Sequence, residues 1–183
     1  GTSVVGVLDQ VVAFTGPSEK ALRRSGLWDG LEKIYLHPGH HADYYPGAIP
    51  ISLKLIFHRK NGRIISAQAV GEQGVEKRID VIAAAIQLGG TVFDLEEAEL
   101  CYAPQFGSAK DPVNMAGFIA SNVLSGDLTL WHAADLDAFP SGTVLLDVRS
   151  RGEYRSGHLV GALHIPHTQL RQRLGELPRD VPV

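Results

Sequence analysis

The sequence predicts an α+β protein, an antiparallel sheet covered by helices and followed by a partial α/β segment. Two apolar, β-branched runs, Ser52–His58 and Arg63–Val70, are separated by four residues that end in Asn-Gly. An Asn-Gly pair at such a tip favours a β-hairpin with a type I′ turn, in which both residues have a positive φ. From Val75 to Ile86 apolar residues return every three or four positions, and charged residues, Arg78 among them, lie between them. This period is that of an amphipathic helix, whose apolar stripe is expected to lie on the sheet.

The residues before the hairpin supply further strands. Ser3–Thr15 is rich in Val and ends at a Gly-Pro pair, so it is predicted as one extended strand closed by a turn. Ser18 can cap a short helix that ends near Gly26. Glu32–Leu36 is then expected to form a second strand.

Two more helices are expected after the long one, which stops at Gly89. Thr91–Leu100 fits a short helical turn. Val113–Leu124 is apolar and follows an Asp-Pro pair, in which the carboxylate can cap the helix and the proline suits its first position. Gly117 and Ala120 form a stripe of small residues, which suits internal packing and a dimer contact equally well.

The loop Cys101–Asn114 is the strongest candidate for function. It holds two prolines, a glycine and the aromatic residues Tyr102 and Phe106 directly before an apolar helix. Pro104 cannot donate to a strand ladder, so it keeps the loop out of a sheet interior. The two rings either pack beneath the loop or are presented to a partner, and the residues alone favour neither. Cys101 is interpreted as a small apolar residue in a strand-like lead rather than as a redox thiol.

A second loop, His37–Gly47, contains three histidines and an aspartate. Imidazole and carboxylate groups are ligands of zinc and iron, so a metal site has to be considered. Consecutive histidines cannot both face one ion, however, and the proline and glycines of this loop suit a turn. We therefore predict no metal site.

Composition sets broad bounds on function. The chain has 183 residues, 44% of them hydrophobic, and a net charge of −3, as in soluble globular proteins. No basic excess points to nucleic acid or to a membrane surface. The sequence has neither an apolar run of about 18 residues nor a secretion leader, so a cytoplasmic protein is expected. One cysteine excludes an intramolecular disulfide framework and a zinc site of several thiolates.

Four stretches resemble the C-terminal dimerisation domain of the flavin-dependent pyridine nucleotide-disulfide oxidoreductases. The resemblance points to the branch that holds coenzyme A-disulfide reductase, NADH oxidase and NADH peroxidase, and it covers the chain from about Thr2 to Gly126. The most specific stretch reads Tyr-Ala-Pro-x-Phe-x-Ser-Ala-Lys-Asp-Pro-Val-Asn-Met-Ala-Gly. In order, the four stretches are His41–Ala48, Ala67–Gly71, Val75–Ala83 and Tyr102–Gly117.

The end of the chain resembles the opening of a rhodanese-like domain. Thr143–Arg149 is predicted as a buried strand, and it is followed by a helical stretch, by Gly-His-x-x-Gly-Ala at Gly157–Ala162 and by a strand that ends in Ile-Pro. This order is typical of parallel α/β proteins. No cysteine follows Cys101, so persulfide chemistry is not expected of these residues. The predicted organisation is a dimerisation domain over 1–126, a linker over 127–140 and an incomplete rhodanese-like domain over 141–183.

No Gly-x-Gly-x-x-Gly fingerprint for a dinucleotide occurs in the sequence. The resemblance therefore implies a C-terminal fragment of a homodimeric enzyme that uses FAD and NAD(P)H. The fragment itself is expected to bind neither cofactor and to be inactive. The alternative is a non-catalytic dimerisation or ligand-binding module.

The resemblance also implies site residues. In coenzyme A-disulfide reductases, tyrosines of this domain reach the flavin and the reactive cysteine of the partner subunit, and the matching positions are Tyr102 and either Tyr44 or Tyr45. A phenol can hydrogen-bond or donate a proton to a developing thiolate. Neighbouring side chains of an extended loop face opposite ways, so the choice between Tyr44 and Tyr45 stays open. Relatives reduce coenzyme A disulfide, coenzyme A persulfide, polysulfide, dioxygen or peroxide. The rhodanese-like segment favours a coenzyme A-linked disulfide or persulfide, and the choice of NADH or NADPH is not predicted.

Overall fold

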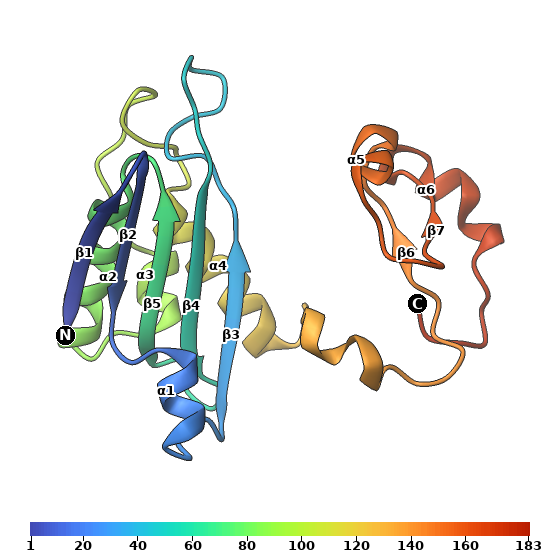
Figure 1. Cartoon of the computed structure of the whole chain (residues 1–183), viewed down its shortest axis with the longest axis horizontal. Helices are drawn as coiled ribbons and strands as arrows, with labels where there is room; N and C mark the ends of the chain where they lie inside the picture. Colours follow the sequence, from blue (N-terminus) through green and yellow to red (C-terminus); the bar gives the residue numbers. More distant parts are fainter. The chain divides into compact units, whose positions relative to one another are not determined.

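The computed structural model describes all 183 residues, which form two compact units, Gly1–Leu130 and Trp131–Val183. The first unit is built on a five-stranded antiparallel sheet with strand order β1-β2-β5-β4-β3 (Figure 1). The predicted α+β class is therefore confirmed. The strands are β1 (Thr2–Val7), β2 (Gln10–Thr15), β3 (Leu31–Leu36), β4 (Ile51–His58) and β5 (Ile64–Gly71), and the helices are α1 (Glu19–Arg24), α2 (Val75–Gln87), α3 (Val92–Glu96) and α4 (Pro112–Ser125).

The main core lies between one face of the sheet and helices α2, α3 and α4. Alternate residues of β4 from Ile51 to Phe57 point into it, as the two-residue period of a strand requires. Val75, Ile79 and Ile82 of α2 are fully buried against them, which confirms the predicted apolar stripe. A smaller cluster on the opposite face joins Leu22 of α1 to β3 and β4.

The hairpin between β4 and β5 is confirmed, but its turn is not type I′. Of the two turn residues Asn61 and Gly62, only Gly62 has a positive φ, at 69°. The His58 amide donates to the Arg63 carbonyl at 2.9 Å, so the loop encloses four residues. The Gly62 carbonyl also accepts from the Val92 amide at 2.8 Å. The turn is thus shaped by its contact with the start of α3 as well as by its own sequence.

The prediction of one strand over Ser3–Thr15 is wrong. The chain reverses at Leu8-Asp9, and Val7 of β1 pairs with Gln10 of β2 in an antiparallel hairpin. Leu8 has a φ of 53° and is almost fully exposed. A Leu-Asp pair is not a recognised hairpin signal, since a positive φ is unusual for leucine.

Helix α4 begins as predicted. Asp111 accepts a hydrogen bond from the Val113 amide at 3.1 Å, and Pro112 occupies the first turn. The small residues of α4 serve internal packing, because a Cβ at Gly117 would come within 2.3 Å of the Glu96 backbone nitrogen. Ala116 and Ala120 are fully buried as well. This stripe is therefore used to bring α4 against α3.

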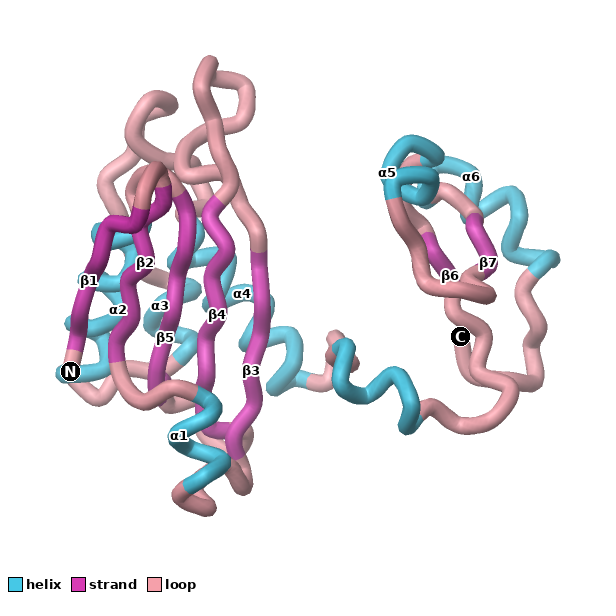
Figure 2. Tube along the Cα trace, viewed as in Figure 1, coloured by secondary structure: helices cyan, strands magenta, loops and turns pink.

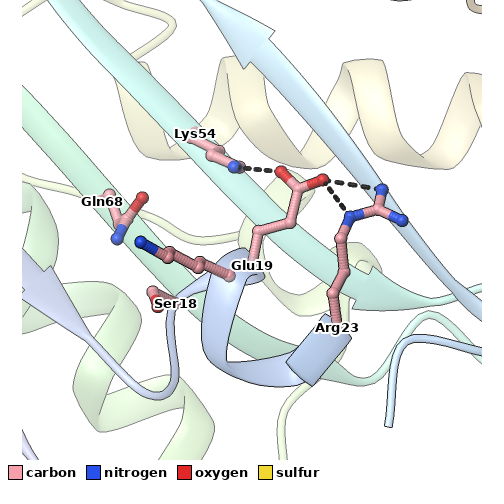
Figure 3. A pocket seen from close by; sticks show the side chains of 6 residues that line it. Ser18, Glu19, Arg23, Lys54 and Gln68 are labelled. Atoms are coloured by element: carbon pink, nitrogen blue, oxygen red, sulfur yellow. Dashed lines mark hydrogen bonds and ion pairs between the residues drawn. The ribbon is translucent and has the colours of Figure 1, made fainter. Parts of the chain in front are cut away.

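An ion cluster holds α1 on the sheet. The Glu19 carboxylate lies between Lys54 and Arg23, as Figure 3 shows, and it also accepts from Lys33 at 2.8 Å. It lines a shallow hollow of about 430 Å³. Burial alone raises the pKa of Glu19, but the hydrogen bonds from the three cations lower this pKa from 4.5 to about 2.

We expect Glu19→Gln to lower the free energy of unfolding by about 1–2 kcal/mol, because three cations lose their shared carboxylate. The folded pKa of Glu19 lies below its ordinary value, so its contribution is complete above pH 4.5 and is lost as the pH falls towards 2. Urea denaturation from pH 7 to pH 2 should therefore show a shallower acid loss for Glu19→Gln than for the wild type. Equal slopes would contradict the prediction.

The second unit contains a two-stranded parallel sheet, which confirms the predicted α/β order. The strand expected over Thr143–Arg149 is confined to two half-buried residues, so its predicted length and full burial are wrong. An apolar run cannot extend a strand beyond the backbone partners that pair with it. The elements are η1 (Ala133–Ala138), β6 (Leu146–Asp147), α5 (Arg151–Ser156), β7 (Leu163–His164), α6 (His167–Arg173) and η2 (Leu174–Glu176). No helix in either unit has the length and apolar character needed to cross a membrane.

Candidate functional site

Two long loops rise together from one end of the five-stranded sheet. Figure 2 shows them as pink tubes, one between β3 and β4 and the other between α3 and α4. They carry the two stretches that the sequence singled out, His37–Gly47 and Cys101–Asn114. The Ala42 amide donates to the Gly107 carbonyl at 3.0 Å, which joins the loops directly.

The β3–β4 loop is closed at its base around His40. The His40 amide donates to the Ile49 carbonyl at 2.9 Å, and the Ile49 amide donates to Nδ1 of His40 at 3.1 Å. Burial lowers the pKa of His40; the Ile49 carbonyl, 3.3 Å from Nδ1, acts in the other direction, and the charges of His41 and Arg78 lower this pKa further. The ring is therefore neutral at physiological pH, as acceptance at Nδ1 requires.

The α3–α4 loop is ordered by a turn and by the cap of α4. The amides of Phe106 and Gly107 both donate to the Ala103 carbonyl, at 2.8 and 3.0 Å. The loop forms no strand, as expected from Pro104. Phe106 is exposed rather than packed beneath the loop.

The tips of the loops bring two tyrosines together. The hydroxyl oxygens of Tyr44 and Tyr102 lie 2.9 Å apart and share a hydrogen bond, although 58 residues separate them in the sequence. The two residues are 75% and 49% exposed, respectively. This hydrogen bond raises the pKa of Tyr44. Tyr45 instead places its ring edge-on to His41, with centroids 5.6 Å apart.

The geometry of this pair has chemical consequences. In a hydrogen bond between two phenols one hydroxyl donates, so the accepting phenol keeps its own proton available for a third group. Because the pKa of Tyr44 is raised, Tyr44 is protonated at neutral pH. The pair can thus offer a hydrogen bond to an anion placed next to it.

Two residues that support the loops were not predicted to do so. Arg78 was predicted only as one of the charged residues between the apolar positions of α2, yet it is 1% exposed and pairs with Asp111. Asp111 was predicted as a helix cap and not as half of a buried ion pair. The one sequence signal for the burial of Arg78 is that it directly precedes Ile79, a residue of the apolar stripe.

Cys101 is exposed, and the strand-like lead expected around it does not form. It stands in irregular backbone outside the sheet, where no strand neighbour covers it. His40 and His41 are buried, and no three His, Cys, Asp or Glu side chains converge as metal ligands do.

Two family models together match most of the chain. The model of the pyridine nucleotide-disulphide oxidoreductase dimerisation domain matches residues 2–112, and that of the rhodanese-like domain matches residues 123–183. A coenzyme A disulfide reductase of Staphylococcus epidermidis is 36% identical over 120 residues, which are 66% of this chain and 26% of the relative.

Comparison with solved structures points to the same family. The Bacillus anthracis protein described as CoADR-RHD is 44% identical with a TM-score of 0.94, over 99% of this chain and 32% of that one. An NAD-dependent persulfide reductase from A. fulgidus is 37% identical with a TM-score of 0.86, over 98% of this chain and 32% of that one. The chain thus spans about a quarter to a third of the length of these relatives. By its first unit it belongs to the pyridine nucleotide-disulphide oxidoreductases, as their dimerisation domain, and a rhodanese-like domain follows.

Proposed function

We propose that this chain is the C-terminal part of an FAD-dependent NAD(P)H:disulfide oxidoreductase that acts as a homodimer. In this proposal the first unit forms the dimer interface and places the phenols of Tyr44 and Tyr102 in the active site of the partner subunit. The observation that carries the proposal is the hydrogen bond between these two exposed phenols at the loop tips. The pair joins two loops that lie far apart in the sequence and leaves both phenols open to a partner.

The proposed substrate is a coenzyme A-type disulfide or persulfide. Support comes from the names of the relatives, which are reductases of coenzyme A disulfide and of persulfide. The rhodanese-like unit is consistent with the same sulfur chemistry. The isolated chain is proposed to be inactive, because it lacks a dinucleotide fingerprint.

The residues of this chain fit one edge of a flavin site and not the whole of it. Tyr44, Tyr102 and Phe106 are exposed and can wall such a site from water. When bound in the full-length enzyme, FAD would pass two electrons from NAD(P)H to the sulfur–sulfur bond. Both FAD and NAD(P)H are thus assigned to the full-length enzyme, and none to the isolated chain.

The role proposed for the phenols is to stabilise a thiolate. A phenol has a pKa near 10 and a thiol near 8.5, so full proton transfer from phenol to thiolate is uphill. Donation of a hydrogen bond to the developing thiolate is therefore favoured over transfer of the proton. One phenol would donate a hydrogen bond to the sulfur. The other phenol would orient the first through the hydrogen bond that the two share.

Mixed dimers of the full-length enzyme test whether the tyrosines act on the partner. One subunit carries Tyr102→Phe, and the other lacks the redox cysteine of the flavin-bearing part. Each homodimer should be slow or inactive. In the mixed dimer, the site with an intact cysteine receives an intact Tyr102 from its partner, so we expect about half of the wild-type activity per dimer.

The comparison is between mixed dimers isolated with two different affinity tags and the two homodimers, all assayed for disulfide reduction. If mixing restores no activity, Tyr102 does not act across the interface and the proposed role is wrong. An unchanged rate in the Tyr102→Phe homodimer would instead favour a module that only holds the subunits together.

A further inference from the structure

The largest fully buried side chain in the structure is that of Arg78, which lies beneath the two loops. Its Nε and Nη2 atoms donate to the two carboxylate oxygens of Asp111, at 3.2 and 2.7 Å. Nη2 also donates to the His40 carbonyl at 2.7 Å, and Nη1 donates to the Gly74 carbonyl at 3.1 Å. The guanidinium group therefore binds three separate segments of the chain.

Two of these segments are the bases of the tyrosine loops. His40 stands four residues before Tyr44, and Asp111 stands nine residues after Tyr102. The guanidinium is planar and its N–H groups have fixed directions, so it sets both the spacing and the orientation of its acceptors. A change at Arg78 would therefore be transmitted to both loop tips.

The surroundings are shaped to hold this group in place. Gly74 has a φ of 68°, and a Cβ there would lie 2.3 Å from Nη1 of Arg78. The Asp111 carboxylate cannot turn away freely, because it also accepts from the Val113 amide at the start of α4. Arg78 thus connects two helices and two loops at one buried point.

We propose that Arg78 is a positioning residue for the tyrosine pair: by binding His40 and Asp111 together, it fixes the hydrogen bond between Tyr44 and Tyr102. Its role in catalysis rests on the function proposed above. A lysine at this position would keep the charge but could not bind the carboxylate in two places while holding the His40 carbonyl.

The test uses Arg78→Lys and Asp111→Asn, with Arg59→Lys as the matched control. Arg59 also pairs with a carboxylate, that of Glu32, but its side chain is largely exposed and it follows β4 at the end opposite the β3–β4 loop. Folding of each variant is first checked by circular dichroism. Asp111→Asn keeps an oxygen for the cap of α4, so it decides the question if Arg78→Lys does not fold.

The first measurement is the pKa of Tyr44. It is obtained by NMR of the 183-residue chain with labelled tyrosine. Loss of the hydrogen bond should lower this pKa towards the ordinary tyrosine value in both test variants and leave it unchanged in Arg59→Lys. Tyr102→Phe removes the hydrogen bond directly, so it gives the size of the Tyr44 pKa change that loss of the bond causes.

The second measurement is turnover of the full-length enzyme. We expect kcat to fall about tenfold to a hundredfold in the test variants, as displaced catalytic groups do. The KM for the pyridine nucleotide should stay the same, because Arg78 has no part in binding the nucleotide. A merely structural role would lower the amount of folded enzyme without changing kcat per folded site.

Wild-type values of both the Tyr44 pKa and kcat in a folded test variant would overturn the inference. A lowered Tyr44 pKa together with full activity of Tyr102→Phe would support the positioning by Arg78 and overturn the proposed function instead. The two proposals can therefore fail separately.

Discussion

Tyr102→Phe is expected to slow disulfide or persulfide reduction by the full-length enzyme about a hundredfold and to leave the dimer whole. The change removes one hydroxyl and keeps the ring, so the shape of the loop is preserved. Removal of a single hydrogen-bond donor to a developing anion in other enzymes typically costs a factor of this size. The expected loss is in kcat, because the proposed hydrogen bond forms as the thiolate appears.

The measurement is steady-state reduction of a coenzyme A disulfide and of a persulfide, with dimer mass followed by light scattering. Tyr35→Phe is the matched control, because Tyr35 is as exposed as Tyr102 but lies on β3 away from the loop tips. Tyr45→Phe should have a small effect, since the Tyr45 ring packs against His41. Full activity of Tyr102→Phe with both substrates would contradict the proposed role.

The sheet and its covering helices could be predicted because their signals are local. The stripe that starts at Val75 and the Asp111-Pro112 start of α4 each lie within a few residues, and both elements form where expected. The reversal at Leu8 could not be predicted, because neighbouring strands stabilise a turn that its own residues disfavour. The type I′ turn predicted at Asn61-Gly62 is absent for a similar reason. The hydrogen bond between Gly62 and Val92 favours a longer turn.

The candidate site depends on contacts between distant residues, and periodicity cannot show these. The resemblance to a family led to Tyr102 and to the pair Tyr44 and Tyr45, whereas the structure shows which phenol of that pair meets Tyr102. Arg78 was missed because a charged residue in an amphipathic helix is normally assigned to solvent. Its burial depends on Asp111, which lies 33 residues further along the chain.

Arg78→Met is expected to lower the free energy of unfolding by about 3–5 kcal/mol, the largest effect on stability that we predict. Methionine fills much of the same volume but leaves the Asp111 carboxylate buried without its cation, and the cost of such an unpaired charge is of this size. The carbonyl groups of His40 and Gly74 lose their donors as well. Urea denaturation followed by circular dichroism gives the value for the variant and the wild type.

The control is Arg59→Met, which removes one partner of a solvent-exposed pair and should cost less than about 1 kcal/mol. A double variant, Arg78→Met with Asp111→Asn, separates the two causes of the loss. Asparagine still has an oxygen to cap α4 but carries no charge, so the double variant should be more stable than Arg78→Met alone. If Asp111→Asn gives no recovery, the unpaired charge is not the source of the loss, and the hydrogen bonds from Arg78 to the loop backbone must account for it.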